Sequence, residues 1–229
     1  MRRVHLFTSS WDALRRTVAQ LPDDAFEAAS GCRGWRTADL VQHLSLQAQE
    51  LLIALATPAE TPPTADSLSW WTPTTVFPTG DSDEDALLAR LADAQGGPVR
   101  SREHFEHVAA AAGRAALLAH PDLPVAAAER ILTVRDLLGA LVLEVTLHHL
   151  DLHAHLPDFA LSSPMSPPAD ALAEARDMVE RRLRLRLPAR WADEHVLRVA
   201  TGRRAPTAAE HTDLEELGER GQMLPLAFG

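Results

Sequence analysis

The sequence predicts an all-α protein, a bundle of four long helices with a further helix after it, and three observations support this class. Apolar residues recur at helical spacing in several segments of the 229-residue chain. Stretches rich in proline and glycine separate these segments. One segment, 137–156, is apolar around most of its circumference, as expected of a helix that lies inside a bundle.

Two helices are expected before the first long loop. The polar run 8–10 offers N-caps for a helix from about Ser10 to Leu21. After a tight, glycine-bracketed turn, Thr37 is a candidate cap for a second helix that runs to about Ala56. His43 lies at the edge of the inner face of this second helix.

The segment from Thr57 to Gly80 is rich in proline, threonine and serine and carries the pair Trp70-Trp71. A loop of this length in a compact domain is usually functional or disordered. Two interpretations stay open. The tryptophans indicate either a lid or pocket wall, or a loop that aromatic side chains fasten to the core.

The rest of the chain continues the helical pattern. Residues 81–84 offer caps for a short helix through Ala94, a third long helix is expected at 101–119, and Thr133 is a candidate cap for the central helix. A proline-rich linker, 157–168, then divides the chain into a metal-binding bundle at 1–160 and an extension at 161–229. The extension is expected to pack on the bundle as an amphipathic helix at 169–187 and a short tail, with 196–199 a candidate single strand.

Composition limits the function classes. The net charge of −10 argues against nucleic acid or an anionic membrane surface as the main partner, because both require a basic face. A single cysteine excludes an intrachain disulfide, and the sequence offers no signal-peptide pattern and no apolar run of membrane-spanning length. A cytoplasmic location and a monomer or homodimer are expected.

The central helix carries ionisable residues on one stripe. At about 100° per residue, Glu144, His148, Asp151 and His155 fall within an arc of about 60°, whereas His149 and His153 point the other way. Ionisable groups on a buried helix are costly unless they are paired, hydrogen-bonded or bound to a metal.

A metal site is one interpretation of this stripe. Glu144 and His148 are four residues apart, so both side chains can reach one divalent transition metal, zinc in the first place. His43 is the best candidate for a third ligand, and three protein ligands would leave a coordination position open, as in catalytic sites. Asp151 could accept a hydrogen bond from His148 and fix its tautomer. Alternatively, Glu144 pairs with an arginine and His148 is a hydrogen-bonded core residue.

Cys32 is a candidate nucleophile, but no histidine or aspartate adjoins it in the sequence. Since only Arg33 and a helix start are nearby, the sequence favours a structural role for this thiol.

Two segments resemble the signatures of a known family. Residues 32–44, Cys-Arg-Gly-Trp-Arg-Thr-Ala-Asp-Leu-Val-Gln-His-Leu, resemble the Cys-Pro-Gly-Trp-x-x-x-Asp-Leu-x-x-His-Leu pattern of the mycothiol-dependent maleylpyruvate isomerase family, with Arg33 in place of the proline. The stretch from Glu144 to Asp151 resembles the second signature, Glu-x-x-x-His-x-x-Asp. The resemblance covers about residues 8–157. It implies a DinB-like four-helix bundle with a short C-terminal helical extension and metal ligands His43, Glu144 and His148.

The same resemblance implies the chemistry. A divalent metal would bind the thiol of mycothiol, or of a similar low-molecular-weight thiol, and keep it as a thiolate; zinc is the first candidate for this metal. This thiolate would attack a small electrophile in an isomerase or S-transferase reaction, with His43, Glu144, His148 and Asp151 as the site residues. Two alternatives stay open: a non-catalytic metal- or ligand-binding bundle with a stress or regulatory role, and a metal-free helical protein with a buried salt bridge.

Overall fold

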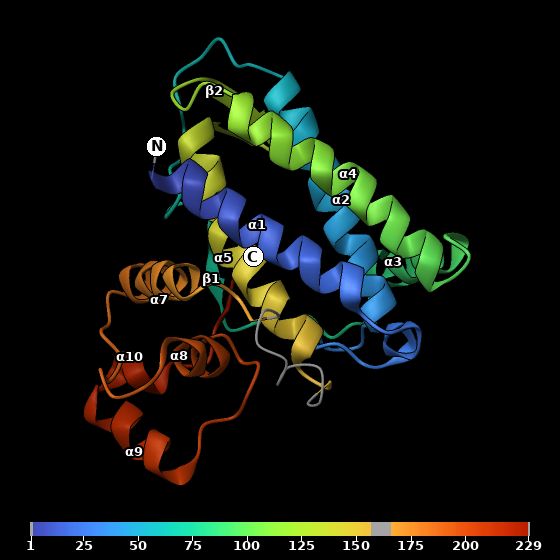
Figure 1. Cartoon of the computed structure of the whole chain (residues 1–229). Helices are drawn as coiled ribbons and strands as arrows, with labels where there is room; N and C mark the ends of the chain where they lie inside the picture. Colours follow the sequence, from blue (N-terminus) through green and yellow to red (C-terminus); the bar gives the residue numbers. More distant parts are fainter. Residues whose placement is uncertain (1, 157–165, 229) are drawn as a thin grey trace.

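The prediction of an all-α protein is confirmed by the computed structural model, which describes residues 2–156 and 166–228 (Figure 1). Strands are short in this part of the chain. The helices are α1 (Arg2–Gln20), α2 (Thr37–Ala56), α3 (Asp83–Ala94), α4 (Pro98–Leu118), α5 (Val134–His153), α7 (Ala169–Leu183), α8 (Asp193–Ala200), α9 (Ala208–Glu216) and α10 (Glu219–Gln222), with a 3-10 turn at Asp23–Glu27.

Helices α1, α2, α4 and α5 form the expected four-helix bundle. Helix α2 packs along α4, and α1 packs against both α4 and α5 (Figure 1). The core between them contains fully buried aromatic and aliphatic side chains, among them Phe7, Leu14, Leu44, Phe105 and Leu138. The bundle therefore holds α2 and α5 in fixed positions, and these two helices carry the predicted site residues.

The central helix α5 has the predicted cap and burial. The Thr133 hydroxyl accepts a hydrogen bond from the backbone N–H of Asp136, so the helix begins at Val134. Buried residues occur on all sides of α5, because α1 covers one side and α7 another. The prediction of an internal helix is confirmed.

The prediction that α1 begins near Ser10 is wrong, because α1 begins at Arg2. The hydroxyls of Thr8, Ser9 and Ser10 do not cap the helix; they donate to backbone carbonyls three or four residues earlier. Leu6 and Phe7 are buried on the same stripe as Trp11. An extended apolar face therefore outweighs the local preference of serine and threonine for helix ends.

Two other helix starts differ by a few residues from the expectation. Thr37 is the first residue of α2 rather than its cap, and the Asp39 carboxylate accepts from the backbone N–H of Arg36. Helix α4 begins at Pro98, a position where a missing N–H costs nothing. By contrast, Ser82 caps α3 as predicted by accepting from the N–H of Asp85.

The C-terminal part contains more helix than predicted. Helix α7 ends at Leu183, because Arg184 adopts a left-handed conformation with φ 50°. The candidate strand at 196–199 is wrong: these residues lie in α8, and its buried positions Val196, Leu197, Val199 and Ala200 follow helical spacing. Helices α9 and α10 replace the expected short tail. The predicted boundary at 160/161, with Pro157 and Pro164, lies outside the described residues, and the division into two domains stays a prediction.

The long loop before α3 packs on the bundle. Trp71 is buried and its indole N–H donates to the backbone oxygen of Ala140 at 3.2 Å. The loop strand β1 (Pro73–Thr74) pairs with the C-terminal strand β4 (Ala227–Phe228), and β2 (Pro124–Ala127) forms a hairpin with β3 (Arg130–Thr133) before α5. None of the described helices is both long and apolar enough to cross a membrane.

Candidate metal centre

His43 of α2 and the pair Glu144 and His148 of α5 face each other across the bundle. The Nε2 atom of His43 lies 3.8 Å from Glu144 Oε1, and the Nε2 atom of His148 lies 4.0 Å from the same oxygen. Single ligand atoms of the three residues all lie within 4.8 Å of one another. The structure thus brings together the three side chains that the sequence singled out.

This donor set fits a divalent metal. Ligands at about 2.1 Å from a tetrahedral zinc ion are about 3.4 Å apart, so each of the two imidazole nitrogens, at 3.8 and 4.0 Å, would approach the Glu144 oxygen by about half an ångström. Among the described residues, Glu144 forms ion-pair contacts with His43 and His148 and none with an arginine. The described residues therefore do not form the alternative arrangement, a salt bridge between Glu144 and an arginine.

Asp151 orients His148 from the next turn of α5. The Asp151 Oδ2 atom lies 3.1 Å from His148 Nδ1. Since Asp151 is ionised, Nδ1 is the donor of this hydrogen bond and the lone pair of Nε2 is directed at Glu144 and His43. Burial lowers the pKa of His148, and Asp151 offsets only part of this effect. A neutral imidazole is the form that binds metals.

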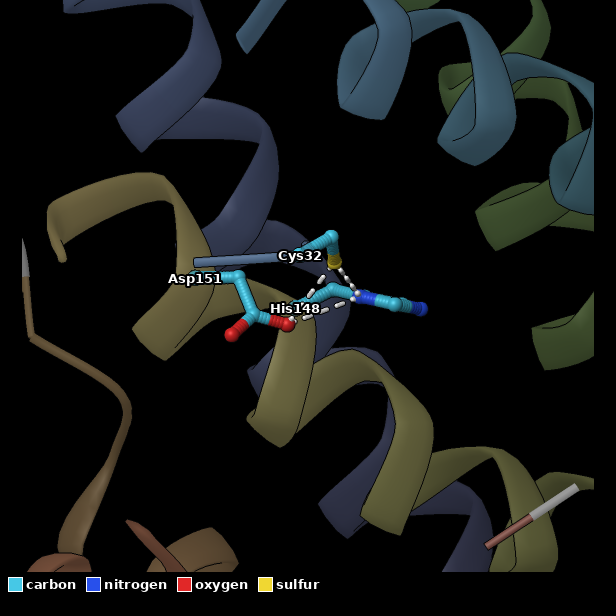
Figure 2. A group of neighbouring side chains, drawn as sticks. All are labelled: Cys32, His148 and Asp151. Carbon is cyan, nitrogen blue, oxygen red and sulfur yellow. Dashed lines mark hydrogen bonds and ion pairs between the residues drawn. The ribbon is translucent and has the colours of Figure 1, made fainter. Parts of the chain in front are cut away.

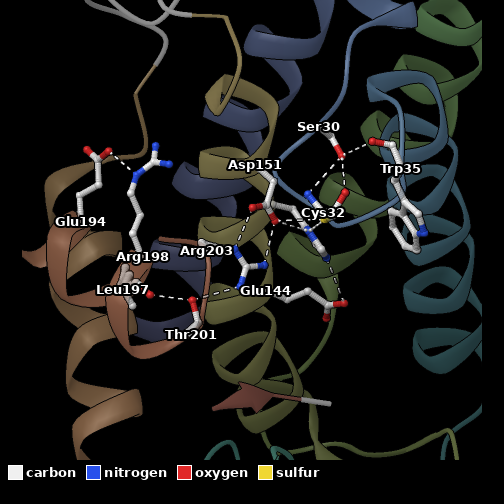
Figure 3. Close-up of polar contacts among 11 residues, drawn as sticks. Ser30, Cys32, Trp35, Glu144, Asp151, Glu194, Leu197, Arg198, Thr201 and Arg203 are labelled. Carbon is white, nitrogen blue, oxygen red and sulfur yellow. Dashed lines mark hydrogen bonds and ion pairs between the residues drawn. The ribbon is translucent and has the colours of Figure 1, made fainter. Parts of the chain in front are cut away.

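Arg203 holds Asp151 in turn (Figure 3). Its Nε and Nη2 atoms each donate to one carboxylate oxygen of Asp151 at 2.8 Å, and its Nη1 atom donates to the Thr201 hydroxyl at 3.1 Å. Burial alone would raise the pKa of Asp151, but Arg203 and then His148 outweigh it and hold this pKa well below its ordinary range. Asp151 is therefore a carboxylate at neutral pH.

Cys32 lies against His148 and Asp151 of α5 (Figure 2). Its Sγ atom is 3.3 Å from Asp151 Oδ2 and 3.7 Å from His148 Nδ1. These three side chains form a second group with metal-ligand spacing. Arg203 already occupies both oxygens of Asp151, however, and its positive charge opposes a cation there. The group of His43, Glu144 and His148 is the better candidate.

A cavity of about 790 Å³ opens beside the candidate centre. Helices α2 and α5 form two of its walls, and the loop with Trp70 and Trp71 forms another. Gly202 and Phe228, from the C-terminal part of the chain, also line it. A small molecule in this cavity can contact the three candidate ligands.

Some residues that the sequence singled out lie away from the candidate centre, and some residues at the centre had not been singled out. His155, on the predicted stripe, is exposed in the turn after α5 and belongs to neither candidate group. His149 is buried on the opposite side, with Nε2 2.8 Å from the Thr17 hydroxyl. The contacts of Cys32 and the ion pair of Arg203 were missed. No local sequence signal distinguishes Arg203 in a chain whose 22 basic residues are all arginine.

Fold and site together define a helical-bundle protein with a candidate metal centre open to a cavity. The model of the mycothiol maleylpyruvate isomerase N-terminal domain matches residues 7–153, more than half of the chain, and the chain belongs to this family of DinB-like bundles. No curated protein and no solved structure gives a significant match. The matched segment ends with α5, so α7–α10 and the C-terminal residues that line the cavity lie beyond it.

Proposed function

We propose that this protein is a metal-dependent, thiol-using enzyme in which His43, Glu144 and His148 bind a divalent metal, zinc in the first place. The convergence of these side chains, with single donor atoms within 4.8 Å of one another beside a cavity, is the observation that supports the proposal. When bound, the metal would lower the pKa of a thiol so that it reacts as a thiolate near neutral pH.

The thiol in this proposal is mycothiol or a similar low-molecular-weight thiol, and its partner is a small electrophile. Membership of the family supports this choice, because the family description names mycothiol. The chain itself would gain a nucleophile that it lacks, since burial, followed by the charge of Asp151, raises the pKa of Cys32 well above its ordinary value. Cys32 stays a thiol at neutral pH and is a poor nucleophile.

The side chains around the centre have separate tasks. Asp151 and Arg203 fix the His148 ring so that Nε2 is presented to the metal. Trp35 and His148 contact His43 on two sides, with ring centroids 5.1 and 5.0 Å away, and limit its rotation. The three protein ligands leave coordination room for the sulfur of the thiol. Attack of this thiolate on an electrophile leads to isomerisation if the thiol leaves again, or to an S-conjugate if it stays.

Metal analysis tests the proposal directly. Purified wild-type protein is expected to contain about one metal ion per chain, and His43→Ala and Glu144→Gln are expected to lose it. Glu50→Gln, a cavity residue on α2 outside the ligand group, serves as the matched control and should retain the metal. Thiol consumption is then followed with mycothiol and a panel of electrophiles. Metal without any turnover would favour a non-catalytic binding bundle, and wild-type protein without metal would refute the proposal.

A further inference from the structure

The cavity is long and follows the facing surfaces of α2 and α5. Residues at helical spacing line it from both helices. They are His43, Gln47, Glu50 and Ala54 on α2, and Leu137, Leu141, Glu144 and His148 on α5. The helices run in opposite directions, so His43 and His148 share one end and Ala54 and Leu137 the other. With a rise of 1.5 Å per residue, the 11 steps from His43 to Ala54 cover about 16 Å. The candidate centre therefore lies at one end of an elongated space.

The end remote from the candidate centre is apolar. Leu137 and Leu141 form the wall on α5, Ala54 faces them on α2, and Ala127 of the β2–β3 hairpin and Trp70 also contribute. Such a surface favours an apolar group, because removing apolar surface from water is favourable by a free energy of about 25 cal/mol per Å².

Of the three arginines that line the cavity, two lie at the end of the candidate centre and one lies near the apolar end. Arg203 is paired with Asp151 beside the candidate centre. Arg33 is exposed and follows Cys32 at that same end. Arg130 is the arginine near the apolar end: its guanidinium lies over the Trp70 ring, and its Nη1 atom donates to the backbone oxygens of Ser69 and Trp70, so it fastens the loop to the hairpin and keeps its positive charge. The wall of Leu137, Leu141 and Ala54 carries no charge.

One acidic side chain lines the cavity between its two ends. Glu50 lines the cavity from α2, between the candidate centre and the apolar end. Glu50 is exposed, so its charge repels an anionic ligand that extends past it through solvent, which screens part of the repulsion. An uncharged tail meets no such opposition.

From this arrangement we infer that the substrate is an electrophile with an uncharged, apolar tail, which occupies the end formed by Leu137, Leu141 and Ala127. The inference rests on the proposed function and specifies its substrate class. It also separates this chain from the acid in the family name, since maleylpyruvate carries a carboxylate at each end. The reacting carbon lies toward His43 and Glu144, and the tail points toward the β2–β3 hairpin.

For an α,β-unsaturated ketone of this class, the chemical step balances without an oxidant or reductant. The thiol sulfur forms a bond to the β-carbon, and the π electrons of the double bond move toward the α-carbon and the carbonyl oxygen. The α-carbon then takes up the proton that the thiol released. The product is the saturated thioether.

Calorimetric titration of the purified protein with two unreactive probes tests the inference. The probes are 4-phenylbutan-2-one and 4-(3-oxobutyl)benzoate, which share the ketone and differ by a carboxylate at the tail. The neutral probe is expected to bind at least about tenfold more tightly, because a carboxylate is costly in an apolar site. Equal or tighter binding of the benzoate overturns the inference.

Two substitutions locate the probe. Leu141→Gln, which puts an amide in the apolar wall, should weaken binding of the neutral probe about fivefold, whereas Leu117→Gln, the same change at an exposed position of α4, should not. Should Leu141→Gln fail to fold by circular dichroism, Ala127→Phe on β2 serves instead, since its ring would fill the apolar end and also weaken binding. Unchanged affinity in the folded variant overturns the inference.

An activity measurement separates this inference from the proposed function. Mycothiol consumption is compared with 4-phenylbut-3-en-2-one and with its para-carboxylate analogue. Faster reaction of the charged electrophile overturns the substrate class and leaves the proposed function intact. Tight binding of the neutral probe without thiol turnover for any electrophile of the panel refutes the proposed function, while the preference of the cavity for an apolar ligand stands.

Discussion

Asp151 of α5 and Arg203, which follows α8, form a two-pronged ion pair directly behind His148 (Figure 3). The residues are 52 positions apart, and the Asp151 side chain is 1% exposed. Arg203 lies beyond the segment that matches the family model. The C-terminal helices are thus tied to the bundle at the point where the orientation of a candidate ligand is set.

A double-mutant cycle should reveal this coupling. Asp151→Asn and Arg203→Met are each expected to lower the free energy of unfolding by about 2–4 kcal/mol, because each leaves a buried polar partner unpaired. The double variant should lose less than the sum, as measured by urea unfolding. Glu194 and Arg198, a half-buried i,i+4 pair in α8 at 2.9 Å that is more accessible to solvent than Asp151, provide the control cycle, with an expected coupling of about 0.3–0.5 kcal/mol. Additive effects at Asp151 and Arg203 would contradict the prediction.

The same pair predicts a pH dependence of stability. The pKa of Asp151 in the folded protein is far below its unfolded value, with Arg203 the main cause of the lowering. The stabilisation is therefore complete above the unfolded pKa of about 4 and disappears as pH falls below it. The difference in unfolding free energy between wild type and Asp151→Asn should shrink between about pH 4 and pH 2. A constant difference over this range would speak against an ionised Asp151.

Gly31 is expected to tolerate no side chain. A Cβ atom there would lie 2.5 Å from Asp151 Oδ1 and 2.8 Å from Asp151 Cα, and the Gly31 backbone N–H donates to the backbone carbonyl oxygen of Asp151 at 2.9 Å. Gly31→Ala should destabilise the protein by about 1–3 kcal/mol through this overlap. Gly113→Ala, in α4, serves as the control because its Cβ would meet the Trp11 ring at 3.2 Å while the helix gains propensity. Thermal unfolding of both variants gives the comparison, and a harmless Gly31→Ala would contradict it.

Residues on one helix were the easiest to predict from the sequence. Glu144 and His148 share a face of α5 because a separation of four residues fixes it, and Thr133 caps the helix as its position suggested. His43 needed a second argument, its place at the inner edge of α2, and the family signature supplied support. Helical period and caps are local properties, so they can be read without knowledge of the fold.

What the sequence did not predict depends on contacts between distant segments. The link between Asp151 and Arg203 forms only because α8 packs on α7 and α7 on α5. Residues 196–199 resemble a strand by composition, yet they form helix α8 since their apolar side chains form a helical stripe that packs with apolar side chains of α5 and α7, among them Leu147 and Met178. In the second case tertiary packing overrides local preference.

The Cys32 thiol is expected to react slowly. Burial first, and the negative charge of Asp151 second, raise its pKa, so little thiolate exists at pH 7.5. Iodoacetamide labelling followed by mass spectrometry should proceed at least about tenfold more slowly than for a small-molecule thiol. Asp151→Asn should label faster, because the charge that opposes ionisation is gone while Arg203 remains. Rapid labelling of the native wild type would show that the thiol is ionised or more accessible than its contacts imply.

Zinc is expected to stabilise the protein through the three candidate ligands. A metal that binds only the folded chain adds about 2.7 kcal/mol when its free concentration is 100 times Kd. Dialysis against a chelator should therefore lower Tm, and added zinc should restore it. Glu144→Gln should abolish most of this shift, since the amide removes the carboxylate that lies within 4.0 Å of both imidazoles. Glu50→Gln, which removes a carboxylate from the same cavity, should keep the full shift. An equal response of both variants would mean that zinc acts elsewhere on the chain.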